Sequence, residues 1–239
     1  MFYKMKKDKT LILIFIISCI LQEMYCCYNK GLLYPFSFLQ GLNIDNNCGL
    51  PYLELCAICL PTIILVLLFS DTYKFYFEEY GCLLLIRNCN LQKRILKIYY
   101  KIICEILVYV FIEFIISLIF NYKYFYDNSK VIVMQLVIYV VNVFLLITLE
   151  VFLCSCAGQG VCQIFINIYV YLSLIVSFYM ENKMIRIVYF PGIFVYAGKQ
   201  NNIEGLCRHF LENLTMQIIF IGAIYGLTVF RCKRKDYLI

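Results

Sequence analysis

The stretch Tyr76–Lys101, YFEEYGCLLLIRNCNLQKRILKIYYK, interleaves charged and apolar residues, and long apolar runs flank it on both sides. Within it, an apolar stripe at helical spacing runs from Leu91 through Ile95 and Ile98, beside a row of basic residues. This pattern predicts an amphipathic helix that lies along a membrane surface and receives a cytoplasmic partner. The alternative is a solvated basic loop that only faces the cytoplasm.

The composition places the chain among integral membrane proteins. Of its 239 residues, 63% are hydrophobic and 15% are charged, whereas a soluble domain has about 45–50% apolar and about 25% charged residues. The mean hydropathy is +0.81. In such a chain the net charge of +6 reports membrane topology, and we expect no nucleic-acid partner.

The apolar runs predict an all-α membrane protein with six transmembrane helices in a single domain, residues 1–239. The expected bounds are about 10–28, 53–70, 102–121, 131–156, 161–180 and 214–230. Residues 122–130 are expected to form a turn, as are residues 157–160. The first run resembles a signal peptide, but its apolar character continues to Tyr28, which favours an uncleaved helix.

The distribution of basic residues predicts the orientation. Six helices would place both termini and the stretch 76–101 on one side, which then carries 14 of the 21 Lys and Arg residues. Because cytoplasmic loops are enriched in Lys and Arg, we expect both termini of this cell-membrane protein in the cytoplasm.

The candidate intramembrane polar residues, all inside the predicted spans, are Glu105, Glu113, Gln135, Asn142 and Glu150. A charged side chain at the bilayer centre costs about 2.5–3.5 kcal/mol on insertion scales, so such residues should face the bundle interior. Glu113 is the deepest by position, whereas Glu105 and Glu150 lie nearer the cytoplasmic ends and can reach water. Either these residues pair between helices, for instance with Gln135 or Asn142, or they form a polar pathway or gate.

The chain has 14 cysteines, most of them inside apolar runs, where they act as small hydrophobic residues. Cys56 and Cys59 form a C-x-x-C motif, but no second pair accompanies it at ligand spacing, so we expect packing and no metal site. Cys48 and Cys207 fall in the expected outer loops and can form a disulfide where the outside is oxidising.

Two enzymatic patterns are incomplete. Residues 192–200, GIFVYAGKQ, come closest to a phosphate-binding loop, but the spacing is one residue too long and Gln replaces Ser or Thr. The chain is therefore expected to bind no nucleotide. The pair Glu78–Glu79 and the segment His209–Asn213 resemble parts of intramembrane prenyl-type proteases, but Leu83 replaces the expected Arg. An enzyme is the third hypothesis.

Two stretches show similarity to a known family at the level of residues. They are Glu79-Tyr80-Gly81, Leu85-Ile86-Arg87, Lys93-Arg94 and Lys97, and Phe190-Pro191-Gly192 before the last helix. Together with six helices and a charged segment between the second and third, this resembles the permease subunit of an ABC-2-type transporter. The similarity is to permeases associated with bacteriocin or lantibiotic export or immunity. By this resemblance, the residues that dock on the ATPase are Glu78, Glu79, Tyr80, Gly81, Arg87, Lys93, Arg94 and Lys97.

The resemblance implies partners and a substrate class. It implies a separate ATPase subunit, a second permease copy or paralogue, and surrounding membrane lipid, with no cofactor and no ATP hydrolysis in this chain. The substrate would be a peptide or another amphiphilic molecule. The alternative hypothesis is a stand-alone bacteriocin-immunity or assembly protein without transport.

Overall fold

The structure is a computed structural model, and it describes residues 2–28, 36–40, 52–70, 91–179 and 210–236. Its elements there are the helices α1 (Phe2–Tyr28), α2 (Ser37–Gln40), α3 (Tyr52–Phe69), α5 (Leu91–Phe120), α6 (Tyr122–Ala157), α7 (Gln159–Tyr179) and α11 (Phe210–Asp236). Within the described ranges, five helices are long and apolar enough to cross a membrane, and α3 is apolar but shorter. The all-α membrane class predicted from composition is confirmed.

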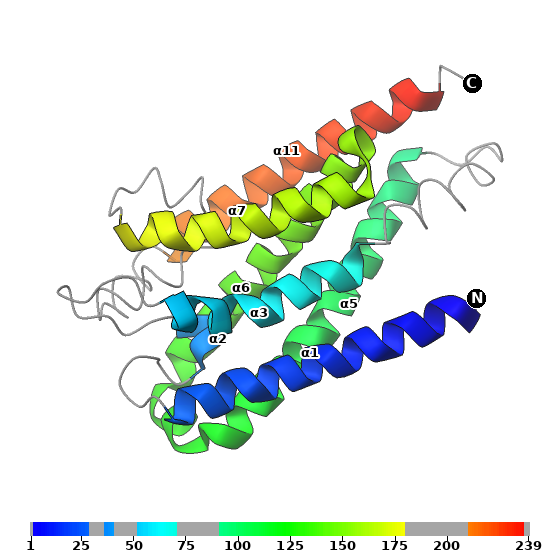
Figure 1. The fold of residues 1–239 in the computed structure, drawn as a ribbon. Coiled ribbons are helices and arrows are strands. Elements are labelled where there is room, and N and C mark those ends of the chain that lie inside the picture. The colour runs from blue at the N-terminus through cyan, green and yellow to red at the C-terminus, as the bar shows by residue number, and fades with distance from the viewer. Residues whose placement is uncertain (1, 29–35, 41–51, 71–90, 180–209, 237–239) are drawn as a thin grey trace.

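Successive long helices run in alternating directions (Figure 1). The beginnings of α1 and α5 and the end of α11 consequently lie at the same end of the bundle. Exposed cations, Lys9, Lys93, Lys97 and Arg231, occupy this end, which we call the basic end. The opposite end, where α5 turns into α6, is the distal end.

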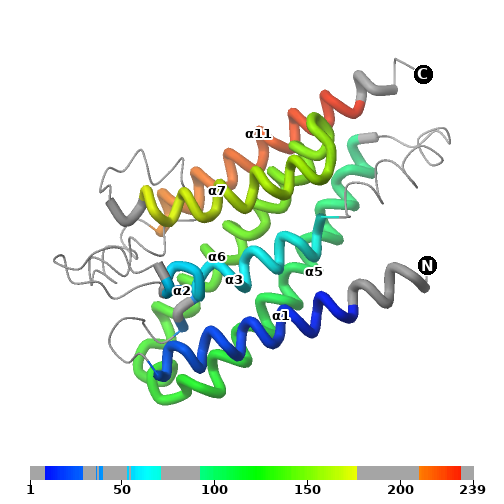
Figure 2. The backbone as a smooth tube through the Cα atoms, in the orientation of Figure 1, coloured from blue at the N-terminus to red at the C-terminus, as the bar shows by residue number. Residues whose placement is uncertain are grey.

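Helix α6 is the centre of the bundle (Figure 2). It packs against α2, α3, α5, α7 and α11, while α1 packs on the other side against α3 and α5. Its buried side chains include the fully enclosed Ile138, Leu145 and Ile147. Each apolar side chain buried between helices in this way holds α6 in place by close packing. Such packing is a main source of helix association in a bilayer.

The expected break between a surface helix and a spanning helix at residue 102 is wrong. Helix α5 continues without interruption from Leu91 to Phe120. The apolar stripe of Ile95, Ile98 and Ile102 is buried in the protein core rather than in a membrane surface. The reason is that neither Gly nor Pro interrupts the sequence here, and the stripe keeps its helical spacing into the apolar run.

The expected turn over residues 122–130 is also wrong, because α6 already begins at Tyr122. Only Asn121 separates α5 from α6, and its side chain donates to the Ser117 carbonyl at 3.3 Å. Helix α6 then bends at Asn128, whose φ and ψ of −123° and 24° are not helical. The Asn side-chain amide can hydrogen-bond to nearby backbone groups in place of the regular helical bonds. Asn therefore suits both the break between the helices and the bend.

The first expected loop contributes to the core through α2. Phe36 lies just before it with a φ of 58°, a left-handed conformation that is unusual for a bulky residue. Its ring is fully buried, with centroids 5.8 Å from Phe114 and 6.2 Å from Phe125. Phe38 makes an edge contact with Tyr139 at 5.1 Å. Aromatic packing therefore holds this short helix against α5 and α6.

The turn predicted at residues 157–160 is confirmed. Helix α6 ends at Ala157, α7 begins at Gln159, and the residue between them is Gly158, with a φ of 83°. A residue with a side chain would be strained in this conformation. The other bounds change modestly: α1 begins before residue 10, and α11 extends beyond 214–230 in both directions.

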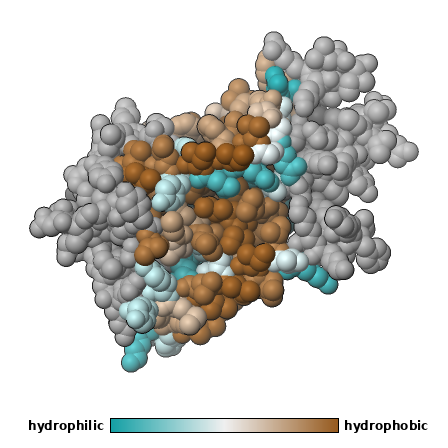
Figure 3. Space-filling model, in the orientation of Figure 1, coloured by the Kyte–Doolittle hydropathy of each residue, from teal (hydrophilic) through white to brown (hydrophobic). Residues whose placement is uncertain are grey.

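Much of the helical surface is apolar. Phe111, Ile119, Ile164 and Ile219 are among the exposed large side chains of α5, α7 and α11. In Figure 3, brown, hydrophobic residues cover most of the described middle of this face. A surface of this kind is suited to contact lipid tails.

Candidate functional site

A row of polar residues lies on one face of the last turns of α5 and continues to the residue just after its end. Glu113, Ser117 and Asn121 follow one another at intervals of four residues, so they lie above one another along the helix. Glu113 and Ser117 are each only 1% exposed. This row faces α1 and α6, and it gathers most of the polar contacts between helices near the distal end.

Glu23 of α1 is the partner of the outer part of this row. Its carboxylate is fully buried and accepts hydrogen bonds from the Ser117 hydroxyl at 2.5 Å and the Asn121 amide at 2.8 Å. Each of these hydrogen bonds offsets part of the cost of burying the polar carboxyl group. They fasten the end of α1 to the end of α5.

Glu113 is held from the other side by α6. The Tyr139 hydroxyl donates to Glu113 Oε2 at 3.0 Å. Within the described residues, Glu113 Oε1 has no hydrogen-bond partner. We call Glu23, Glu113, Ser117, Asn121 and Tyr139 the polar cluster; it links α1, α5 and α6.

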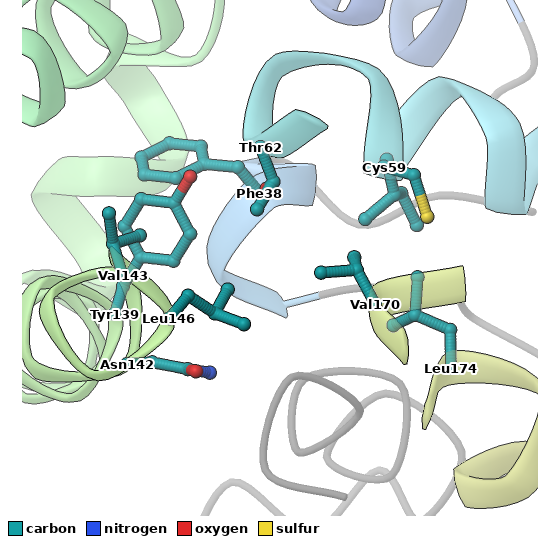
Figure 4. A pocket seen from close by; sticks show the side chains of 10 residues that line it. Phe38, Cys59, Thr62, Tyr139, Asn142, Val143, Leu146, Val170 and Leu174 are labelled. Atoms are coloured by element: carbon teal, nitrogen blue, oxygen red, sulfur yellow. The ribbon is translucent and has the colours of Figure 1, made fainter. Parts of the chain in front are cut away.

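A cavity lies beside Tyr139, between α2, α3, α6 and α7 (Figure 4). The cavity has a volume of about 30 Å³, which is room for about two waters. Its walls are mostly apolar, and the polar groups in them are Thr62, Cys59, Tyr139 and Asn142. In Figure 4 the Thr62 side chain and the Tyr139 ring lie on the same side of the cavity.

Gln135, Tyr139 and Asn142 occupy one face of α6, and all three are buried. Asn142 lines the cavity. Gln135 Oε1 has no hydrogen-bond partner among the described residues. The expected pairing of Glu113 with Gln135 or Asn142 is not the one found, because the hydrogen bond comes from Tyr139 between them.

The two remaining acids differ from each other. Glu105 is half exposed and lies 3.9 Å from Lys101 on the same helix, as a residue near a water-facing end can. Glu150 was expected to reach water in the same way, but its side chain is 1% exposed. Closeness to the helix end does not expose Glu150, because its neighbours Ile147, Val151 and Cys154 on α6 are buried as well.

Part of the predicted coupling segment is described. Lys93 and Lys97 are exposed at the beginning of α5, and Arg94 is half-buried. The other residues assigned to it, Glu78, Glu79, Tyr80, Gly81 and Arg87, lie outside the described residues. So do Cys48, Cys207, His209 and residues 192–200.

The two cysteines of the C-x-x-C motif differ in burial. Cys59 is buried at the cavity, whereas Cys56 is exposed with its sulfur 4.0 Å from the Tyr171 hydroxyl. The described cysteines form no disulfide with one another, and among the described residues no three potential ligands lie together as a metal site would require. Cys19, Cys154 and Cys162 are buried among apolar side chains, as expected for packing residues.

Sequence reasoning missed Glu23 and Tyr139 as members of the site. One signal was present: Ser117 and Asn121 continue the spacing of Glu113 along an apolar helix, which indicates a polar face that needs a partner. The sequence holds no signal that selects Glu23 as that partner. As a whole, the polar cluster can hold three helices together and can bind a proton or another small polar species inside the bundle.

Residues 15–238 match a family model described as "Protein of unknown function (DUF2705)". The comparisons with curated proteins and with solved structures found no match.

Proposed function

The chain belongs to the DUF2705 family, whose description assigns no activity, and we propose from its geometry that it is the permease subunit of an ATP-driven, ABC-2-type exporter. The substrate would be a peptide or another amphiphilic molecule. In this proposal a separate ATPase docks on the basic end, which faces the cytoplasm. In this proposal the five long apolar helices and the shorter α3 all cross the membrane.

The observation that carries the proposal is the continuity of α5. The same helix presents Lys93 and Lys97 at the basic end and holds Glu113 in the polar cluster, about 30 Å away at a rise of 1.5 Å per residue. A rigid helix transmits a push at one end to the other. A partner that moves the beginning of α5 would therefore move the polar cluster against α1 and α6.

Contacts with α11 support the same reading. The Tyr99 hydroxyl donates to Thr228 Oγ1 at 3.3 Å, and the Tyr225 hydroxyl donates to the Gln92 carbonyl at 3.2 Å. These bonds tie the beginning of α5 to the end of α11 at the basic end. A docked partner would consequently act on two membrane helices together.

The second copy that a permease requires has a candidate surface on α11. Gly222 and Gly226 form a G-x-x-x-G motif, and a Cβ atom added to either would meet nothing within 4 Å. Small residues at this spacing let two membrane helices approach closely. We assign this face of α11 to contact with the partner permease.

Purification of the tagged full chain from its native membranes in mild detergent tests the proposal. ATP hydrolysis and an ATPase subunit, identified by mass spectrometry, should copurify, and native mass spectrometry should find two copies of the chain. The double variant Lys93→Glu/Lys97→Glu should lose the ATPase, because charge reversal replaces attraction by repulsion at the docking surface.

The matched control is Lys123→Glu/Lys130→Glu, which reverses two exposed charges at the distal end. It should retain the ATPase. Equal recovery from both variants would show that the basic end is not a docking surface. A purified chain without any ATPase would favour the stand-alone immunity or assembly protein.

A further inference from the structure

We propose that Glu113 is a proton-binding site inside the bundle, which exchanges its proton with water in the neighbouring cavity through Tyr139. The proposal rests on the geometry of the polar cluster and holds whether or not the chain serves an exporter.

Among the described residues, those around Glu113 offer it hydrogen bonding but no opposite charge. Its side chain is 1% exposed, and the titratable groups that face it are the Tyr139 hydroxyl from α6 and the Cys19 thiol and Glu23 carboxyl from α1. Within the described part of the chain, no Lys, Arg or His forms an ion pair with it. A carboxylate buried without a cation is costly, and binding a proton removes that cost.

Glu23 and Glu113 differ in how many hydrogen-bond donors their carboxyl oxygens have among the described residues. Both oxygens of Glu23 accept hydrogen bonds, from Ser117 and Asn121. An ionised carboxylate is an acceptor only, so this environment suits a negative charge on Glu23. Glu113 has one donor, and its second oxygen has no partner among the described residues. Of the two neighbouring carboxyl groups, Glu113 is therefore the one that takes the proton.

Tyr139 connects Glu113 to the cavity. Its hydroxyl is hydrogen-bonded to the Thr62 side chain as well as to Glu113, and both Thr62 and Tyr139 line the cavity. The cavity has room for about two waters. A hydroxyl group both donates and accepts, so it can pass a proton without being left charged.

The exchange conserves protons and charge. A hydronium ion in the cavity gives one proton to the Tyr139 oxygen and becomes water. The hydroxyl releases its original proton to Glu113 Oε2, and the carboxylate becomes a neutral carboxylic acid. The reverse transfer restores the carboxylate, so the site changes by one unit of charge in each direction.

Infrared spectroscopy of the full chain in lipid vesicles, recorded during a pH titration, tests this assignment. The wild-type protein should show a carbonyl band of a protonated carboxylic acid that decreases as the pH rises. Glu113→Gln should lose this band. Tyr139→Phe should shift its frequency, because the hydrogen bond to Glu113 is absent. Glu105→Gln, which changes an exposed acid on the same helix, should leave the band unchanged.

Persistence of the same band in Glu113→Gln would overturn the proposal, as would the absence of a titrating band in the wild-type protein. Circular dichroism and size-exclusion chromatography check that the variants fold. If Glu113→Gln does not fold, Tyr139→Phe decides: a shifted band supports the proposal, and an unchanged band overturns it.

Discussion

Glu105 and Glu113 lie about two turns apart on α5, yet their environments are opposite. Glu105 is 46% exposed and pairs with Lys101 at 3.9 Å. Glu113 is 1% exposed and accepts a hydrogen bond from another helix. An exposed ion pair contributes about 0–1 kcal/mol, whereas a buried acid needs its partners to remain buried. Neighbouring helices, and not position along α5, therefore decide what each acid does.

The largest effect should come from removing a donor to a buried carboxylate. Ser117→Ala deletes the hydroxyl that binds Glu23 Oε1 at 2.5 Å and leaves that oxygen buried without this partner. We expect a loss of about 2 kcal/mol in the free energy of unfolding. Reversible unfolding in mixed detergent micelles measures it.

A double-mutant cycle isolates the interaction. In a Glu23→Leu background, Ser117→Ala should cost much less, because no carboxylate is left to satisfy. Ser173→Ala is the matched control, since that buried hydroxyl donates to the Val170 carbonyl of its own helix at 2.7 Å. A loss of the same size in both backgrounds would show that the bond to Glu23 does not stabilise the fold.

A smaller effect is expected at the inner part of the polar cluster. Tyr139→Phe keeps the ring that packs on Phe38 at 5.1 Å but removes the hydrogen bond to Glu113. The free energy of unfolding should fall by about 1 kcal/mol, the usual net value of one hydrogen bond. No change in the same unfolding measurement would mean that another group replaces the hydroxyl.

The smallest effect is expected at the exposed acid. Glu105→Gln removes the charge that faces Lys101, and solvent already screens this pair. The free energy of unfolding should change by less than about 0.5 kcal/mol. If the loss equals that of Tyr139→Phe, the contrast between the two acids is not one of burial.

The sequence predicted those features that depend on local chemistry. Apolar content identified the membrane class, and Gly158 marked a turn that only a residue tolerating a positive φ can make. The bounds of α5 and α6 were wrong where polar residues interrupt the apolar pattern. Lys93 to Lys101 and Tyr122 to Lys130 suggested surface or turn structure, but neither segment contains a residue that must end a helix.

The site was predictable only in part, because its contacts are long-range. Glu113 was identified from its depth in an apolar run. Its partner Tyr139 is 26 residues away, and Ser117 and Glu23 are 94 residues apart. Hydrophobic periodicity reports which face of a helix is buried, but it does not report which other helix covers that face.

The single residue between α6 and α7 also bears on how the protein is made. A one-residue connection is too short to let α6 enter the membrane while α7 stays outside it. We expect α6 and α7 to insert as one hairpin, with Tyr122 and Tyr179 crossing together. The α6–α7 hairpin is thus a single unit of biogenesis. A reporter or epitope inserted at Gly158 would separate the two helices and disturb their joint insertion.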